Sequence, residues 1–398
     1  MHALIAPAPF KGSLSAAAAA EAMVEGARRA AHELGHPLAL DVVPLADGGE
    51  GTVDAVQRAR GGTLRYARVR DPLGRPIEAA YLLLDDGTAV VEMAAASGLP
   101  LLAAQERDPL RASTHGTGDL IAAALDAGAR RLVIGVGGSA TVDGGAGMAE
   151  ALGVRLLDDA GHPLPPSGGA LLGLAHVDLL ALRPGLRDVE IDVLCDVQNP
   201  LCGPNGAARV FGPQKGATPA MVETLDAGLG RLGEVLEREV GRPLAQMPGA
   251  GAAGGLAAGL AGFLGARLRP GIDVILDLLD VPRRLRAADL ALTGEGQLDR
   301  QTSGGKVIAG LARAADEAGV PVVAIAGRVV PQARELYTRG LRAAFSLADG
   351  PRSLEECEAH GAALLARASE NVVRLWLAAA ASGNRRQAPG DGPPTTGD

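Results

Sequence analysis

The chain contains three lysines, Lys11, Lys215 and Lys306, among 38 basic residues that are otherwise arginines. Each lysine has a glycine next to it in the sequence. Lysine carries a compact point charge on a flexible stem, whereas arginine presents a planar fork. A small cation beside backbone N–H groups that glycine leaves uncovered suits a phosphate group. The pattern points to phosphate chemistry, and three surface lysines that neighbour glycine by chance are the alternative.

The segment 293–306 combines carboxylates, hydroxyls, glycines and a lysine between an expected strand and an expected helix. Glu295 and Asp299 offer hard oxygen ligands, which Mg²⁺ uses together with phosphate oxygens. Lys306 follows a glycine pair where the helix is expected to begin. The ending resembles that of a P-loop, but the first Gly and the final Ser or Thr of that motif are missing. A magnesium and phosphate site is predicted, and a solvated loop is the alternative.

A second glycine-rich loop, at 135–147, follows an expected strand and precedes a helix. Glycines let the backbone approach an anion, and a helix start offers free N–H groups. The loop also matches Gly-x-Gly-x-x-Ala, with Asp158 and Asp159 about 20 residues further on, as in dinucleotide-binding sites. That fingerprint opens its helix inside the motif, whereas here the segment 141–145 intervenes. The loop is predicted to bind an anion; a dinucleotide site and a structural turn stay open.

Two acidic loops complete the polar candidates. Asp196 comes just after an expected strand, where it could hold a metal or act as a base for a hydroxyl; a turn-capping role is the alternative. Asp47 lies in an acidic, glycine-rich loop that could bind the polar groups of a small substrate or cap the following helix.

A zinc-protease pattern, His-Glu-x-x-His, occurs at 32–36. That motif needs both histidines on one continuous helix face. Gly35 and Pro37 are expected to end the helix there, so we predict no metal at this position.

Composition narrows the class of protein. The 398 residues suffice for two domains, and the net charge of -8 with a pI near 5.5 disfavours a nucleic-acid surface. No apolar stretch is long enough to span a membrane. The three cysteines fit neither a disulfide framework nor a zinc spacing, which favours a reducing cytoplasm.

The predicted fold class is α/β, with two domains. Residues 1–62 and 285–381 alternate strands and helices, and we expect them to form one discontinuous Rossmann-like domain with a parallel sheet built by both chain ends. Residues 63–284 begin with three strands joined by tight turns, which predicts an inserted α/β domain with mixed or antiparallel strands. Residues 382–398 lack an apolar period and are expected to be a disordered tail.

Taken in order, these loops resemble the bacterial glycerate kinase family of type I, whose members are similar to glycerate 2-kinases. One departure is Ala8-Pro9, where the family usually carries Asp or Asn and then Ser before Phe-Lys. The matching stretches are 6–15, 46–52, 135–147, 195–201, 211–217, 251–255, 270–273 and 293–306.

The resemblance implies two α/β domains around a cleft, with ATP and Mg²⁺ as cofactors. It implies ATP-dependent phosphorylation of glycerate, with 2-phosphoglycerate as the favoured product. The residues are assigned as follows: Asp196, Lys306 and Lys11 to catalysis; Gly137, Gly138, Ser139, Lys215, Gly294, Gly304 and Gly305 to the nucleotide; Asp47, Lys11 and Thr293 to the substrate; Glu295 and Asp299 to the metal.

Two other classes of function stay open. A nicotinamide-dependent hydroxy-acid dehydrogenase would use the 135–147 loop as a dinucleotide site, and a non-catalytic carboxylate-binding protein would use the same cations without turnover. The expected partners are the small substrate and ATP, without nucleic acid or membrane, and a homodimer is left open.

Overall fold

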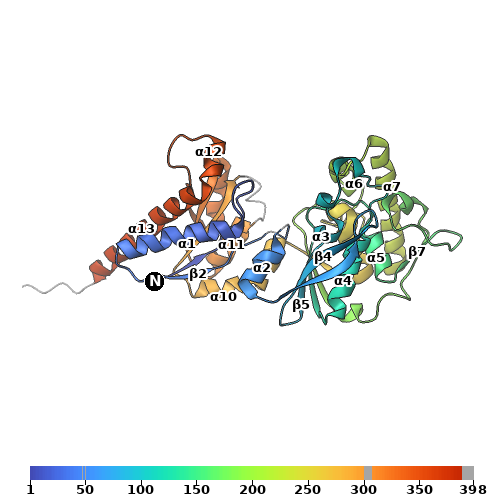
Figure 1. Cartoon of the computed structure of the whole chain (residues 1–398), viewed down its shortest axis with the longest axis horizontal. Coiled ribbons are helices and arrows are strands. Elements are labelled where there is room, and N and C mark those ends of the chain that lie inside the picture. Colours follow the sequence, from blue (N-terminus) through green and yellow to red (C-terminus); the bar gives the residue numbers. More distant parts are fainter. Residues whose placement is uncertain (47, 50, 300–306, 388–398) are drawn as a thin grey trace, which may run out of the picture. The chain divides into compact units, whose positions relative to one another are not determined.

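The computed structural model describes residues 1–46, 48–49, 51–299 and 307–387 (Figure 1). They form two compact units. Of the described residues, unit 1 holds 1–44, 281–299 and 311–387, and unit 2 holds the others. Both chain ends therefore belong to unit 1 and the middle of the chain to unit 2. Residues 45–62 lie with the middle here, and the domain boundaries drawn from the sequence stay a prediction.

Unit 1 is built on a five-stranded sheet in the order β13-β12-β11-β1-β2, and every pair of neighbours is parallel. Numbered within the unit, this is the doubly wound order 2-1-3-4-5, whose topological switch point lies between β1 and β11. The predicted parallel sheet from both chain ends is confirmed. Its strands are β1 (His2–Ile5), β2 (Ala39–Val42), β11 (Leu290–Leu298), β12 (Val322–Val329) and β13 (Leu341–Ser346).

Helices α1 (Ala16–Glu33) and α13 (Gly361–Gln387) lie side by side in Figure 1 and share the core of unit 1 with β1, β11 and β12. Ser15 accepts a hydrogen bond from the Ala18 N–H and so caps α1. At Gly26 the two helices approach so closely that a side chain would overlap the Ala366 carbonyl. The unit also contains α10 (Val281–Arg286), α12 (Leu354–Ala359) and most of α11 (Val307–Glu317).

Two helix ends bear on the sequence predictions. Helix α1 ends at Glu33, and Gly35 follows with a φ of 64°, so the predicted helix end before the second histidine of the 32–36 pattern is confirmed. Helix α13 continues beyond residue 382, where the tail was expected to begin.

Unit 2 contains a six-stranded mixed sheet in the order β10-β9-β6-β5-β4-β3. The strands β3, β4 and β5 form the predicted antiparallel meander, and β5, β6, β9 and β10 are parallel. A separate antiparallel pair, β7 and β8, was not predicted. The strands are β3 (Thr63–Arg70), β4 (Pro76–Leu83), β5 (Thr88–Glu92), β6 (Arg131–Gly135), β7 (Arg155–Leu157), β8 (His176–Asp178), β9 (Glu190–Leu194) and β10 (Arg267–Arg269).

Helices cover this sheet and complete one continuous apolar core, drawn from Val69 to Ala266. The segment before α8 is not regular helix, because Ala253 and Gly254 adopt positive φ angles and the α-helix begins at Leu256. The helices are α2 (Thr52–Arg60), α3 (Ala94–Ser97), α4 (His115–Asp126), α5 (Ala146–Ala151), α6 (Ala207–Phe211), α7 (Pro219–Val240), α8 (Leu256–Leu264) and α9 (Gly271–Leu278).

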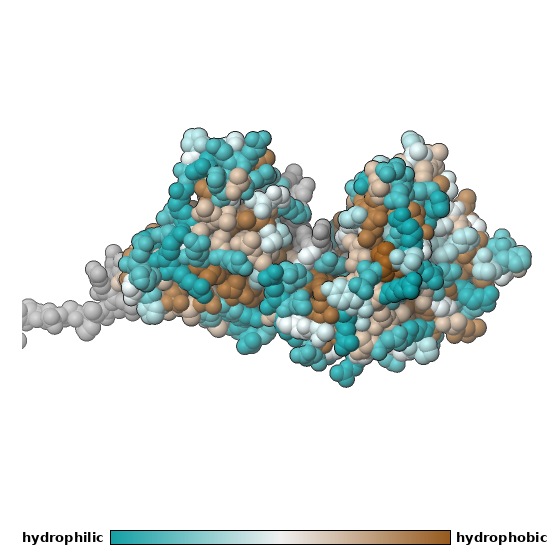
Figure 2. Space-filling view, in the orientation of Figure 1, coloured by the Kyte–Doolittle hydropathy of each residue, from teal (hydrophilic) through white to brown (hydrophobic). Residues whose placement is uncertain are grey.

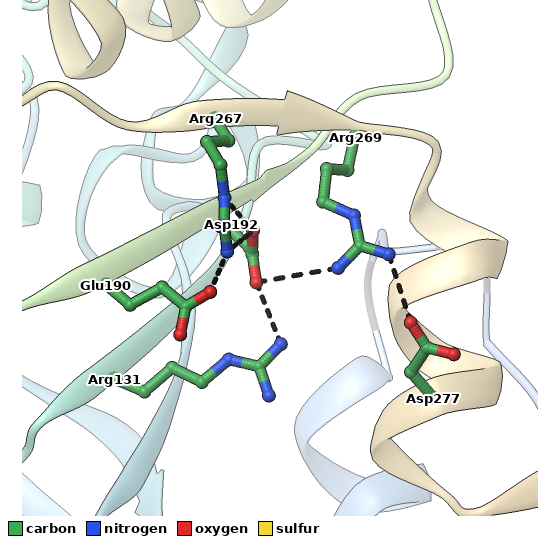
Figure 3. Close-up of polar contacts among 6 residues, drawn as sticks. All are labelled: Arg131, Glu190, Asp192, Arg267, Arg269 and Asp277. Atoms are coloured by element: carbon green, nitrogen blue, oxygen red, sulfur yellow. Dashed lines mark hydrogen bonds and ion pairs between the residues drawn. The ribbon is translucent and has the colours of Figure 1, made fainter.

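The buried carboxylate of Asp192 in β9 holds the edge strand β10 in place (Figure 3). Arg267 of β10 donates two hydrogen bonds to Asp192 Oδ1, and Arg131 of β6 donates one to Oδ2 at 2.8 Å. Arg269 lies 3.8 Å from Oδ2. A buried carboxylate needs such partners because its desolvation is costly. This cluster therefore has a structural role.

The face of the protein in Figure 2 intersperses hydrophilic and hydrophobic residues over both units. None of the helices in the described part of the chain is both long and apolar enough to cross a membrane.

Candidate functional site

Unit 2 contains a cavity of about 280 Å³. Part of its lining follows β6 and β9, which are parallel neighbours, so the segments after Gly135 and Leu194 emerge at the same sheet edge. The polar lining includes Gly137, Gly138, Ser139, Asp196 and Lys215. The structure thus brings together the predicted anion loop, one predicted catalytic acid and one of the three lysines.

The glycine loop presents bare backbone to this cavity. Gly137 and Gly138 are exposed, and Gly138 has a φ of 74°, which favours glycine. Within the described part of the chain, the backbone N–H groups of 137, 138 and 139 donate no hydrogen bond. Helix α5 begins only at Ala146, so the helix does not open inside the motif and the dinucleotide fingerprint is not formed. Free N–H groups in a glycine loop are suited to bind an anion.

Lys215 is buried, with 2% of its surface exposed, although it lines the cavity. Its Nζ donates to Ser139 Oγ at 2.5 Å and to the Thr141 carbonyl at 2.7 Å. An ammonium has three donors, and in the described residues no third partner of Nζ is found. Burial lowers the pKa of Lys215 to about 7, and the nearby charge of Asp143 acts in the opposite direction. One N–H of the Lys215 ammonium is therefore left to donate to an anion in the cavity, and such an anion would also stabilise the buried positive charge.

Asp143 stabilises the conformation of this loop through hydrogen bonds. It is fully buried, and its carboxylate accepts hydrogen bonds from the N–H groups of Thr114, Gly145 and Gly147 and from the Thr114 hydroxyl. Burial raises the pKa of its carboxyl group. Sequence reasoning missed this residue; an acid enclosed by glycines and apolar residues at 142–147 is the signal that could have identified it.

Asp196 is exposed and lines the cavity. Its Oδ1 accepts a hydrogen bond of 2.8 Å from the N–H of Gly271, the first residue of α9. A carboxylate at a helix start is favoured by the helix dipole. Asp196 therefore caps the start of α9, and the same bond holds the carboxylate at the wall of the cavity.

Unit 1 gathers a second group of predicted residues at its switch point. Lys11 lies in the loop after β1 and is exposed, and its backbone N lies near Gly296 of β11, where a side-chain carbon would stand 3.5 Å away. Glu295 precedes Gly296 in the same strand. The carboxyl ends of strands beside a switch point are where open α/β sheets bind ligands. The structure therefore supports a shared location for Lys11 and Glu295.

Two residues predicted to bind ligands in this unit make close structural contacts. Thr293 is fully buried and its hydroxyl donates to the Ala6 carbonyl at 2.7 Å, which joins β11 to the end of β1. At Gly294 a side chain would overlap the Ile325 carbonyl of β12. These contacts give no support to a substrate or nucleotide role for either residue.

The spacing of the predicted magnesium ligands allows one of the two carboxylates to bind the ion directly. Strand β11 is extended through Leu298, so a rise of roughly 3.3 Å per residue puts the Cα atoms of Glu295 and Asp299 about 13 Å apart. Two carboxylates at that spacing do not meet on one ion without a bend in the chain. No cluster of three or more acidic, His or Cys ligands occurs among the described residues. Mg²⁺ commonly binds with one protein carboxylate, phosphate oxygens and waters.

The remaining predicted site residues, Asp47, Gly304, Gly305 and Lys306, lie outside the described residues.

Comparison with known proteins decides between the classes of function that the sequence left open. The model of the glycerate kinase family matches residues 3–377. The chain belongs to the glycerate kinase family. The family resemblance seen in the sequence is therefore confirmed, and the chain is an enzyme of the kinase class; the dehydrogenase and the non-catalytic binding protein lose their support.

Full-length relatives agree with this membership. The "Glycerate kinase" of Halalkalibacterium halodurans is 46% identical over 94% of this chain and 98% of its own. The "Glycerate 2-kinase" of Escherichia coli K12 is 43% identical over 94% of this chain and 97% of its own. A crystal structure of a protein from Salmonella typhimurium LT2, assigned as a glycerate kinase 2, is 42% identical with a TM-score of 0.85 and covers 97% of this chain and 99% of that one.

Proposed function

We propose that this enzyme transfers the γ-phosphoryl group of ATP to D-glycerate, with 2-phosphoglycerate as the favoured product and ADP as the second product. One observation carries the proposal: the cavity of unit 2 combines a cation, free N–H groups and a carboxylate. Glycerate has matching groups, since it is a small anion with hydroxyls. The naming of the Escherichia coli relative favours the 2-phosphate isomer.

The roles proposed for the residues follow from charge and position. Asp196, held by the Gly271 N–H, accepts the proton of the reacting hydroxyl. Lys11 and Lys306 neutralise phosphate charge, since phosphoryl transfer depends mostly on positioning and electrostatic stabilisation. Asp47 remains a proposed substrate contact.

Mg²⁺ would be held by Glu295 or Asp299 directly, with the other carboxylate acting through water. When bound, it would supply neutralisation of the triphosphate charge. The chain's own residues would orient the acid and the triphosphate around it.

Phosphorus NMR of the purified protein with ATP, Mg²⁺ and D-glycerate tests the activity and the product isomer in one spectrum. We expect ADP and 2-phosphoglycerate to appear together. No phosphoglycerate, or a glycerate-dependent change in nicotinamide absorbance instead, would contradict the proposal. Exclusive formation of the 3-phosphate would retain the kinase and correct its regiospecificity.

We also propose a cytoplasmic enzyme, because the three cysteines carry free thiols.

A further inference from the structure

We propose that the cavity of unit 2 binds the three-carbon acid, with the carboxylate of that acid at Lys215 and the glycine loop, and that it does not bind the triphosphate of ATP. This inference rests on the proposed function and makes it more specific. It also changes the assignment of Gly137, Gly138, Ser139 and Lys215, which sequence reasoning gave to the nucleotide.

Charge balance in the cavity is the first argument. Among the described lining residues, Lys215 is the one cation and Asp196 is the one acid. A single carboxylate matches one ammonium and a few N–H groups. A triphosphate carries several negative charges, and Asp196 would repel them. The described part of the lining therefore suits a monoanion.

The identity of the donors is the second argument. Residues 137–139, whose N–H groups donate no hydrogen bond in the described part of the chain, line the same cavity as Lys215. The Lys215 ammonium is buried, and a buried donor without a partner is costly, so a ligand in the cavity would complete its hydrogen bonding. The N–H groups of Gly137 and Gly138 lie in exposed residues and are accessible to the same ligand. A carboxylate has two oxygens with several lone pairs and satisfies such a set of donors.

Asp196 gives the third argument, because it specifies what else the ligand carries. Its carboxylate accepts hydrogen bonds and is fixed by the Gly271 N–H. A hydroxyl on the ligand would donate to it. An acid with a nearby hydroxyl therefore complements both ends of the lining.

The size of the cavity agrees with a small acid. Its volume of about 280 Å³ lies just below the roughly 300–1,000 Å³ of pockets that bind drug-sized ligands. A three-carbon acid fits within it, and a nucleoside triphosphate is much larger.

Ligand binding should be accompanied by proton uptake. With its pKa lowered to about 7 by burial, Lys215 is mostly neutral in the free enzyme at pH 8. A bound carboxylate favours the charged ammonium, so close to one proton would be taken up at pH 8 and fewer at pH 6. The other titratable groups near Lys215 are Asp143 behind it and Cys195 and Asp196 in the lining.

Calorimetry on the full-length enzyme tests the inference with two probes, D-glycerate and a non-hydrolysable ATP analogue with Mg²⁺. The variants are Lys215→Met, which removes the charge, and Ser139→Ala, which removes a hydrogen-bond partner of Nζ and keeps the lysine. Arg155→Met is the matched control, since Arg155 is half-exposed on β7 and lines no part of this cavity.

We expect Lys215→Met to weaken D-glycerate binding by at least about tenfold, with a smaller loss in Ser139→Ala and unchanged affinity for the analogue in both. Wild type should take up protons at pH 8 in buffers of different ionisation enthalpy, and Lys215→Met should not. Weakened binding of the analogue together with normal glycerate binding would assign the cavity to the nucleotide and overturn the inference. Equal losses of affinity for both probes would also overturn it. If Lys215→Met does not fold, Ser139→Ala decides by the same criteria.

Failure of the proposed function gives a different result. Wild type that does not phosphorylate glycerate in the NMR assay contradicts the function itself. If wild type phosphorylates glycerate and the variants bind glycerate with normal affinity, the function stands and this inference alone is contradicted.

Discussion

Lys215 is a cation in a place where a cation is costly. Its ammonium is buried, and its compensating partners are a hydroxyl, a carbonyl and the more distant charge of Asp143. Sites that bind anions commonly keep such unfavourable charges at the expense of stability. Arginine at this position would bring a larger, planar group into a space shaped for a point charge, which is consistent with retention of lysine in a chain so rich in arginine.

This position predicts how stability changes with pH. Lys215 binds a proton below about pH 7 in the folded state and below its ordinary value of 10.5 in the unfolded state. Between these values the unfolded chain binds more protons, so this group makes folding more favourable as pH rises. We expect the free energy of unfolding of wild type to rise relative to Lys215→Met by up to about 1.4 kcal/mol per pH unit in this window.

Urea unfolding at pH 7, 8 and 9 measures this difference, and the other titrating groups cancel because both proteins contain them. A difference that stays constant with pH would mean that Lys215 keeps its ordinary pKa in the folded protein.

Residues differ in how far the sequence reveals them. Glycine loops after strands are visible in the sequence, and they led to Gly137, Ser139 and Asp196, which the structure places around one cavity. Asp143 and Asp192 were not, because their roles depend on burial and on partners far away in the sequence, such as Thr114 and Arg267. Thr293 was assigned to the substrate because it carries a hydroxyl in a polar loop. The sequence does not show that this hydroxyl donates a hydrogen bond to the Ala6 carbonyl.

At the scale of elements, the sequence predicted the longer strands better than the three-residue strands. The meander β3–β5 has turn residues and an alternating pattern, which are local signals. β10 and the pair β7 and β8 are three-residue strands. They depend on tertiary contacts, as the ion pairs that hold β10 demonstrate, and no local pattern marks them.

Two glycines inside helices predict opposite effects of the same substitution. Gly26→Ala in α1 would place a methyl group against the Ala366 carbonyl of α13, so the helices must separate. We expect a loss of about 1–3 kcal/mol in the free energy of unfolding, the usual cost of overpacking. Gly230→Ala in α7 meets its nearest atom at 3.8 Å, an ordinary contact. It should stabilise by about 0.5–1 kcal/mol, since alanine favours helix more than glycine does.

Denaturant titration of both variants checks the pair, with Gly230→Ala as the matched control for helix propensity. If Gly26→Ala is as stable as Gly230→Ala, then α1 and α13 do not pack as closely as described.

At the scale of the whole molecule, the two units differ in how the chain builds them. Unit 1 needs both chain ends, because β1 pairs with β11 across most of the sequence. Unit 2 is nearly continuous and has a core of its own, drawn from Val69 to Ala266. The alternation of strands and helices at both ends predicted the parallel sheet that both chain ends build. Helix α2 continues the helix-and-strand pattern of the first segment and lies with unit 2, so a local pattern does not show to which unit an element belongs.

The continuity of unit 2 predicts that residues 45–280 fold when expressed alone. The fragment retains all strands of the mixed sheet and the complete cavity lining. It lacks Gly310, which packs against the buried Ile272 of α9, so we expect it to be less stable than the full chain. A single cooperative urea transition and dispersed amide NMR signals would establish folding. If the cavity binds the three-carbon acid, D-glycerate should shift the signals of 137–139 while the ATP analogue leaves them unchanged. A fragment without a cooperative transition would mean that unit 2 depends on unit 1 for its fold, and that the continuous core is not sufficient by itself.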